Sequence, residues 1–162
     1  MERLWAPWRM RYIEGLAQPS DCFLCDYPRL PVEKDPETLI LARGEKAFVI
    51  LNLFPYNCGH MVVAPYEHQG IYEEVPAETH AEMAALTSRA IAALRAEYDP
   101  QGFNIGMNLG RVAGAGVPDH LHEHVVPRWG GDANFMTTVG ETKTLPESLD
   151  QTYARLRPHL AG

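Results

Sequence analysis

Three short apolar segments joined by brief connections constrain the fold of this chain more than any other feature. They cover residues 38–42, 47–53 and 60–64. The link at 43–46 contains Gly44 and has the length of a hairpin connection. Residues 55–59 run from a proline to a glycine and suit a turn before the third segment. Because parallel strands need a crossover of a dozen or more residues, links this short predict an antiparallel sheet.

A long helix is expected after the third strand. Apolar residues recur at helical spacing over residues 76–98, namely Met83, Leu86, Ala90, Ile91 and Leu94. A proline begins this stretch, and Asp99-Pro100 ends it. Residues 102–109 fit a fourth strand. Residues 145–160 fit a C-terminal helix, with Pro146 suited to its first turn.

Histidine occupies every second position at His120, His122 and His124. If residues 120–126 form a strand, the three imidazoles share one face. Imidazole suits proton transfer near neutral pH, attack on phosphorus and metal binding. Three such rings on one face cannot all become cationic without repulsion, so we expect a functional site there. Glu123 would point to the opposite face, where a structural role with a partner is favoured over catalysis.

These elements predict an α+β fold with one antiparallel sheet of about five strands, a long crossover helix and a C-terminal helix. We expect one domain over residues 1–162. It consists of an aromatic N-terminal arm with the cysteine pair at 1–36, a core at 37–129, and a tail with a helix at 130–162.

Composition limits the function. Of the 162 residues 46% are hydrophobic and 22% are charged, which is typical of a folded domain. The formal net charge of −7 and the lack of a basic stripe argue against binding of a nucleic-acid polymer. We find neither an apolar run long enough for a membrane span nor a signal peptide, so a cytoplasmic protein with a small anionic ligand is expected.

Cys22 and Cys25 form a C-x-x-C motif, which in an intracellular protein suggests metal or redox chemistry and which is expected to open a short helix. Two thiolates make half of a tetrahedral zinc site, and His60, His68 and one of the three alternating histidines are candidates for the rest. Redox chemistry is disfavoured because the motif lies in a proline-rich loop before an antiparallel sheet. Cys58 is expected to be a buried, inert thiol. Residues 114–117 form a glycine-rich loop whose amides can approach a phosphate.

The residues His120-Leu121-His122-Glu123-His124-Val125-Val126 resemble the signature of the histidine-triad (HIT) superfamily. Residues 51–55, 59–65 and 127–128 lie where other landmarks of that family fall, so the similarity runs from about 38 to 128. Residues 5–9, the C-x-x-C motif and residues 127–136 resemble more particularly the bacterial branch related to diadenosine tetraphosphate phosphorylases.

The resemblance implies a division of labour among the histidines. His122 would be the nucleophile that forms a covalent nucleotidyl-histidine, and His124 would contact the phosphate in the transition state. In metal-bearing relatives the first triad histidine joins the cysteine pair and a histidine after the third strand. The corresponding structural zinc ligands here are Cys22, Cys25, His68 and His120. His60 would buttress the triad.

The resemblance also implies a nucleotide site. Asn52 would bind the ribose, and Asn108 with the amides of Gly116 and Val117 would hold the phosphates. Leu41, Phe48 and Ile50 would form the base pocket. Without the family, Asn52 is better explained as a turn residue and His60 as a buried strand histidine.

Two residues depart from the family pattern. Glu123 stands where the simplest motif has an apolar residue, and its direction leaves catalysis intact. Val117 replaces a hydroxyl residue near the leaving group in many relatives, which leaves the leaving group and the second acceptor open.

The implied activity is nucleotidyl transfer from dinucleoside polyphosphates such as diadenosine tetraphosphate, with phosphorolysis to ADP and ATP favoured. Hydrolysis, cleavage of AMP from amines and non-catalytic nucleotide binding are the alternatives. The resemblance further implies magnesium on the polyphosphate substrate and a homodimer with sheets joined across its interface.

Overall fold

The structure is a computed structural model that describes residues 22–132 and 145–161. Residues 1–21 of the expected N-terminal arm lie outside the described residues, and so does the part of the expected tail at 133–144.

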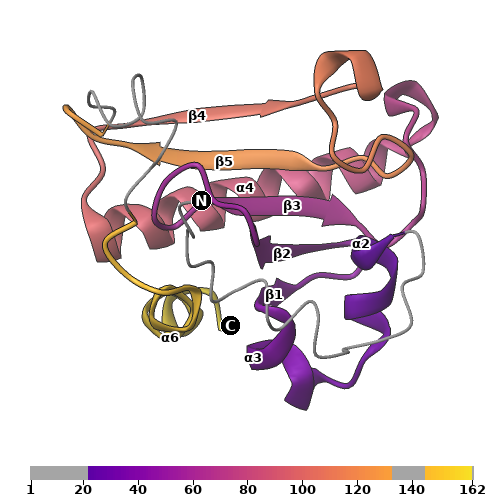
Figure 1. Ribbon diagram of the computed structural model, residues 1–162. Helices are drawn as coiled ribbons and strands as arrows, with labels where there is room; N and C mark the ends of the chain where they lie inside the picture. The colour runs from indigo at the N-terminus through magenta and orange to yellow at the C-terminus, as the bar shows by residue number, and fades with distance from the viewer. Residues whose placement is uncertain (1–21, 133–144, 162) are drawn as a thin grey trace, which may run out of the picture.

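Five strands form one sheet (Figure 1). They are β1 (Ile40–Arg43), β2 (Ala47–Leu51), β3 (Met61–Pro65), β4 (Gly102–Met107) and β5 (Glu123–Arg128). Their order is β1-β2-β3-β5-β4, and every neighbouring pair is antiparallel. The short links at 44–46 and 52–60 make β1, β2 and β3 a meander, whereas β4 and β5 follow the long helix. The expected α+β fold with a five-stranded antiparallel sheet is confirmed.

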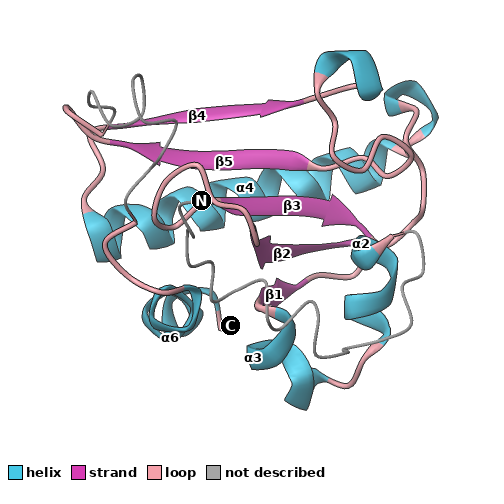
Figure 2. Cartoon of the chain, viewed as in Figure 1, coloured by secondary structure: helices cyan, strands magenta, loops and turns pink. Residues whose placement is uncertain are grey.

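Helix α4 (Ala77–Tyr98) packs against one face of the sheet, behind the strands in the view of Figure 2. Its buried side chains include Met83, Leu86, Ala90 and Leu94, the residues whose spacing predicts the helix. The C-terminal helix α6 (Leu149–Leu160) lies against α4 and β1 and buries Leu156 and Leu160. The two helices thus cover apolar side chains of the sheet, and one continuous core results.

Two short helices precede the sheet. α2 (Phe23–Asp26) begins directly after Cys22, and α3 (Asp35–Thr38) leads into β1. Between them and in later loops lie short 3₁₀ turns, η1 (Tyr27–Arg29), η2 (Val32–Lys34), η3 (Tyr72–Glu74) and η4 (Arg111–Ala113). The expected short helix at the C-x-x-C motif is confirmed.

A buried ion pair fixes this N-terminal segment to the sheet. Arg43 of β1 pairs with Asp35 at 2.7 Å, and the carboxylate side chain is only 3% exposed. The same guanidinium donates to the carbonyl oxygens of Pro28 and Leu30, at 2.6 and 3.1 Å. One β-strand arginine therefore holds the turn that follows α2 and the start of α3.

Several element boundaries differ from those expected; β2 and β4 end two residues earlier, and β3 lies one residue later. β5 begins at Glu123, so His120 and His122 precede the strand. Thr38 belongs to α3 instead of β1, because Leu39 takes a left-handed conformation (φ 64°) that ends the helix. Pro146 lies before α6, whose N-cap is Ser148 with Gln151 in a capping box.

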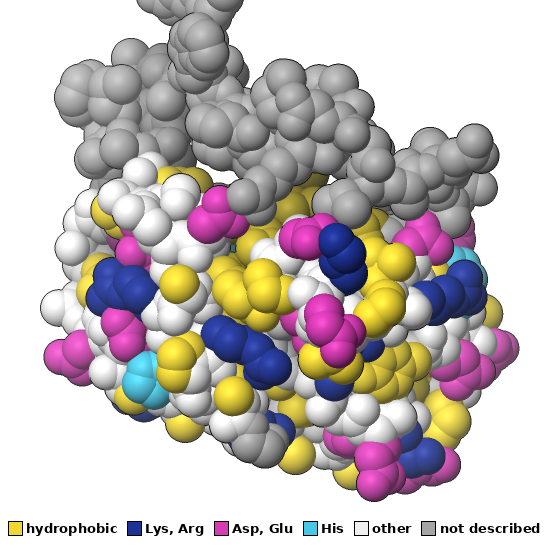
Figure 3. Space-filling view, turned by 90° about the horizontal axis from the view of Figure 1, so that it is seen from below, with side chains coloured by type: hydrophobic (Ala, Val, Ile, Leu, Met, Phe, Trp, Pro, Cys, Tyr) yellow, Lys and Arg dark blue, Asp and Glu magenta, His cyan; other side chains and the backbone are white. Residues whose placement is uncertain are grey.

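The surface carries both signs of charge. On the face seen in Figure 3, acidic and basic side chains are interspersed among small apolar areas. None of the helices within residues 22–132 and 145–161 is long and apolar enough to cross a membrane.

Candidate functional site

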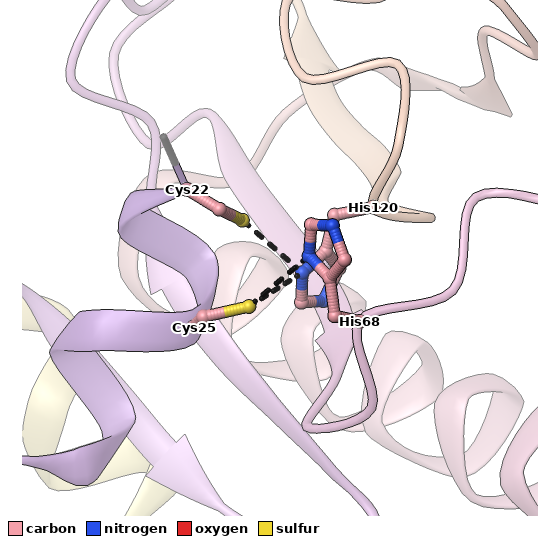
Figure 4. A group of neighbouring side chains, drawn as sticks. All are labelled: Cys22, Cys25, His68 and His120. Carbon is pink, nitrogen blue, oxygen red and sulfur yellow. Dashed lines mark hydrogen bonds between the residues drawn. The ribbon is translucent and has the colours of Figure 1, made fainter. Parts of the chain in front are cut away.

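Cys22, Cys25, His68 and His120 converge at one point (Figure 4). Their ligand atoms all lie within 4.8 Å of one another. The Sγ atom of Cys25 lies 3.2 Å from Nδ1 of His68 and 3.4 Å from Nδ1 of His120, and Sγ of Cys22 lies 3.3 Å from the same His120 nitrogen. Four soft and intermediate ligands in this arrangement can hold a metal ion.

The surroundings orient His120 for such a role. Its Nε2 lies 2.8 Å from the carbonyl oxygen of Pro65, which can only accept a hydrogen bond. Nε2 therefore carries the proton, and Nδ1 presents its lone pair to the two thiols. The imidazole is 1% exposed. Burial, and next the neighbouring Cys25, raises the pKa of Cys22 to about 11. A bound cation would stabilise the thiolate form instead.

His122 and His124 turn away from this cluster and face each other, with ring centroids 5.1 Å apart. Nδ1 of His122 lies 2.8 Å from the carbonyl oxygen of His120, so Nδ1 donates and Nε2 keeps a free lone pair. The His122 side chain is 7% exposed and held in place, so Nε2 is a nitrogen suited to attack an electrophile.

A chain of hydrogen bonds fixes the tautomer of His124. The backbone N–H of Tyr56 donates to Nδ1 of His60 at 3.0 Å, which leaves the proton of His60 on Nε2. That Nε2 donates to Nδ1 of His124 at 2.9 Å. His124 in its neutral form therefore carries its proton on Nε2, where it can donate to an oxygen anion.

Burial keeps these imidazoles neutral. It lowers the pKa of His60 to about 3, with a smaller contribution from His124. Burial, followed by the nearby His122, also lowers the pKa of His124. The pair therefore offers a directed N–H donor at neutral pH instead of a diffuse positive charge.

Glu123 points to the opposite face of the sheet and accepts a hydrogen bond from Thr87 Oγ1 of α4. Its strand partners are Val63 of β3 and Met107 of β4. The carboxylate thus has the partner that its position requires, and it tethers β5 to the helix.

The glycine-rich loop lies beside the start of β5. Gly110 and Gly114 both have positive φ angles, 84° and 93°, which favour glycine. Gly116 is exposed, and no atom lies within 4 Å of the position that a Cβ would take there, whereas Val117 is partly buried. The amide of Asn108 reaches the Gly114 carbonyl oxygen only at 3.5 Å, so it is weakly engaged.

The other expected nucleotide-binding residues lie on β1, β2 and the loop that follows. Asn52 is partly exposed, and its Oδ1 accepts from the backbone N–H of Phe54 at 2.9 Å, as in an Asx turn. Its amide nitrogen lies 3.3 Å from Nε2 of His60. Leu41, Phe48 and Ile50 belong to the hydrophobic core, where none is more than 1% exposed.

A pocket of about 370 Å³ opens beside His124 on the face of the sheet that carries this ring. Polar and aromatic side chains line it: Tyr56, Asn57, Asn104, Asn108 and Arg128. Of these only Asn108 is among the residues expected from the sequence. Arg128 lies two steps of strand alternation beyond His124, and this period-two spacing is the signal that could have placed it on the same face.

Comparison with known proteins agrees with this geometry. A model of the HIT domain matches residues 33–131, which include the five strands and the three alternating histidines. An AP-4-A phosphorylase of Mycobacterium tuberculosis is 41% identical over 161 residues, covering 94% of this chain and 80% of that protein. The fold and site define a histidine-triad protein, and the chain belongs to the HIT-domain family.

Two further similarities bear on the site. An adenosine 5'-monophosphoramidase of Schizosaccharomyces pombe is 29% identical over 107 residues, which is 66% of this chain and 74% of that protein. The crystal structure of a zinc-bound histidine triad family protein from Mycobacterium smegmatis superposes with a TM-score of 0.67 at 30% identity, covering 86% of this chain and 93% of that one.

Proposed function

We propose that this protein transfers AMP from dinucleoside polyphosphates, with diadenosine tetraphosphate as the leading substrate. The observation that carries the proposal is the free Nε2 lone pair of His122 beside the Nε2–H of His124. This pairing puts a nucleophile next to a donor that can neutralise charge on a phosphate oxygen. The similarity to an AP-4-A phosphorylase supports the choice of substrate.

The proposed reaction has two displacements. His122 Nε2 attacks the α-phosphorus, the P–O bond to the β-phosphate breaks, and ATP departs with the electron pair of that bond. The AMP-histidine intermediate then reacts with orthophosphate, whose oxygen forms a new P–O bond while the P–N bond breaks, which gives ADP. Splitting one hard displacement into two in-line steps lowers the barrier for each.

For the nucleotide we propose contacts from Asn52 to the ribose and from Asn108, Gly116 and Val117 to the phosphates. The exposed position of Gly116 and the weakly engaged amide of Asn108 support the phosphate contacts. The proposed base pocket is the cluster of Leu41, Phe48 and Ile50, which the sheet places across β3 from His124. Because these side chains are at most 1% exposed, the side chains that cover them have to move before a base can enter.

We propose that the metal of the Cys22, Cys25, His68 and His120 cluster is zinc. Tetrahedral zinc with ordinary bond lengths places sulfur and nitrogen ligands about 3.5 Å apart. Three of the four sulfur–nitrogen separations in this cluster, 3.2 to 3.4 Å, are close to that value, and all ligand atoms lie within 4.8 Å of one another. Four protein ligands leave no open position, so the ion would have a structural role. This cluster is the one candidate metal site in the described part of the chain, so magnesium would be held by the polyphosphate itself.

Water as the second acceptor would make the protein a hydrolase, and an amine leaving group would make it a phosphoramidase. The similarity to an adenosine 5'-monophosphoramidase favours testing the second alternative. Incubation with diadenosine tetraphosphate, with and without orthophosphate, separates phosphorolysis from hydrolysis, and incubation with adenosine 5'-phosphoramidate tests the amine leaving group. We expect ADP plus ATP that depends on phosphate; AMP plus ATP without phosphate would contradict phosphorolysis.

The nucleophile has a separate test. His122→Ala should abolish covalent labelling by diadenosine tetraphosphate carrying a labelled α-phosphate, while nucleotide binding persists. His80→Ala, a histidine on α4 that contacts Tyr72, serves as the control. Binding without any label in the wild-type protein would support a non-catalytic nucleotide-binding protein, and equal labelling of the His122 variant would contradict the assigned nucleophile.

We further propose a cytoplasmic homodimer that binds no nucleic-acid polymer. None of the cysteines in the described part of the chain, Cys22, Cys25 and Cys58, forms a disulfide, which is the state expected in a reducing compartment. Strand β4 is at the edge of the sheet and pairs with β5 on one side only, among the strands that the structure describes. On the face seen in Figure 3, acidic and basic side chains are interspersed and do not form the basic stripe that a phosphate backbone requires.

A further inference from the structure

The β4 wall of the pocket beside His124 lies away from the expected nucleoside, whereas Tyr56 and Asn57 line the pocket from the loop that carries Asn52. Sheet order places β5 between β3 and β4, so Asn52 after β2 and the pocket lining from β4 are on opposite sides of His124. A substrate held at the ribose by Asn52 and attacked at its α-phosphorus would therefore continue toward β4. In an in-line displacement the leaving group departs away from the nucleophile, and the pocket is lined by His124 but not by His122.

Arg128 gives the pocket a fixed positive group. Asp132 accepts from its Nε at 2.6 Å and from its Nη2 at 2.9 Å, so one edge of the guanidinium is held bidentately. The Asp132 side chain is 10% exposed, whereas that of Arg128 is 45% exposed. The carboxylate thus orients the guanidinium from the covered side, and Nη1, which also donates to Asn104, is on the opposite edge.

The β4 wall of the pocket leaves room for a ligand. Gly106 is the direct partner of His124 across the β4–β5 ladder. It is exposed, and nothing lies within 4 Å of the position that its Cβ would take. Asn104, the next residue on the same face, pairs with Val126. The volume of about 370 Å³ suits a phosphorylated small molecule rather than a single ion.

We propose that this pocket is a binding site for the leaving nucleotide, in which Arg128 with Asn104 contacts the phosphates beyond the α-phosphate. Arg128 is then a specificity-determining residue that distinguishes dinucleoside polyphosphates from AMP donors with a small leaving group. This inference rests on the proposed function.

The test measures equilibrium binding of diadenosine tetraphosphate and of AMP to the full chain carrying His122→Ala, which cannot turn the substrate over. Adding Arg128→Ala should weaken binding of diadenosine tetraphosphate by roughly ten- to a hundredfold, the effect of losing one or two charge-assisted hydrogen bonds. AMP affinity should change less than about twofold, since AMP has no phosphate in the pocket. The unchanged AMP affinity also shows that the variant is folded.

Variants that change the space in the pocket provide an independent test. Gly106→Val should fill the pocket and weaken binding of diadenosine tetraphosphate but not of AMP. Gly102→Val is the matched control, because Gly102 is on the same strand with equally open space and is not a lining residue. Arg95→Ala removes an exposed arginine that lies over Phe103, and it controls for general charge loss. Both controls should leave the two affinities unchanged.

In the otherwise wild-type protein, Arg128→Ala should lower kcat/KM for diadenosine tetraphosphate about tenfold relative to adenosine 5'-phosphoramidate. Equal losses of affinity for the two ligands, or of kcat/KM for the two substrates, would overturn the pocket assignment and indicate a structural role. An Arg128→Ala variant with no loss for either compound would also overturn it. Failure of the His122→Ala chain to bind either nucleotide, with no turnover by the wild type, would contradict the proposed function itself.

Discussion

At the scale of single residues, backbone groups decide the protonation of the histidines. The Tyr56 N–H fixes the His60 tautomer at one end of the chain of rings, and His60 fixes that of His124. At the other end the carbonyl oxygen of His120 fixes His122. His122 and His124 therefore each present one defined nitrogen to a ligand. In serine proteases, by contrast, a carboxylate orients the catalytic histidine.

This arrangement predicts an acid-sensitive fold. The pKa of His60 is about 3 in the folded protein because of burial and His124, against 6.5 for an exposed imidazole. As pH falls below 6.5 the unfolded chain takes up a proton that folded His60 does not. The free energy of unfolding should therefore decrease on acidification between about pH 6.5 and 3.

His60→Gln should remove this contribution. Between pH 6.5 and 5 the wild type should lose about 2 kcal/mol more stability than the variant, at about 1.4 kcal/mol per pH unit and proton. Urea denaturation at several pH values measures this difference. His80→Gln should keep the wild-type slope, and a His60→Gln slope equal to that of the wild type would contradict the prediction.

The sequence predicts which residues form this site better than it predicts what each of them does. Alternation alone indicates His122 and His124 as neighbours on one face, and they are. It cannot show that His120 turns to the cysteines, because that depends on where β5 begins. Tyr56 lies far from the histidine run, in the loop after β2, and only the fold brings it to the pocket.

At the scale of elements, one carboxylate holds α6 to the rest of the fold. Glu147 precedes this helix, and its Oε1 accepts from Cys58 at 3.0 Å, from Thr152 at 2.8 Å and from Tyr98. Arg155 donates to Oε2 at 2.9 Å. Burial raises the pKa of Glu147, but these hydrogen bonds outweigh it and the net shift is downward.

Glu147→Gln should cost roughly 1 to 3 kcal/mol, because it removes the charge that four donors share in a covered position. The midpoint of urea unfolding reports the loss. Glu37→Gln is a suitable control, since Glu37 is 46% exposed in a surface ion pair with Lys34, and such pairs contribute little. Equal costs for the two variants would contradict the role assigned to Glu147.

The cysteine cluster predicts that α2 needs a bound metal ion to stay folded. This helix has four residues, far too few for stability on its own. The wild-type protein should contain about one zinc per chain, as should Cys58→Ser, whereas Cys22→Ser and Cys25→Ser should contain almost none. Metal analysis by mass spectrometry measures this. Full zinc content in the Cys22 and Cys25 variants would rule out the cluster as the metal site.

Element boundaries were predictable where the pattern was long. The helix predicted at 76–98 is α4 at Ala77–Tyr98, since its apolar residues recur over about three turns, from Met83 to Leu94, and Asp99-Pro100 ends it. The C-terminal helix starts later than expected, because the capping box of Ser148 and Gln151 determines its first turn. Pro146, which was expected in that turn, lies before the helix. The Glu147 contacts join residues 49 and 89 positions apart, beyond the reach of any local pattern.

At the scale of the whole molecule, the edge strand β4 sets the expected assembly. Ile105 in its centre is 46% exposed, an apolar side chain on an open edge. A homodimer joined along β4 would cover it.

Light scattering should therefore give twice the mass of one chain. Ile105→Lys should shift the protein toward monomer at micromolar concentration, because a charge at the centre of such an interface is left without a partner. Val32→Lys, which changes an apolar residue 55% exposed on the other side of the fold, should not. A monomeric wild type would contradict the homodimer.

The Cys/His cluster has a consequence for how the chain reaches its native pairing. Its ligands come from the start of α2, from the loop after β3 and from His120 ahead of β5. A slip of β5 by one residue against β3 would move every side chain to the other face. It would take His120 from the thiols and His124 from His60 together. A metal ion bound by all four ligands would therefore stabilise only the native register of β5, and the rate of metal binding would report the completion of folding.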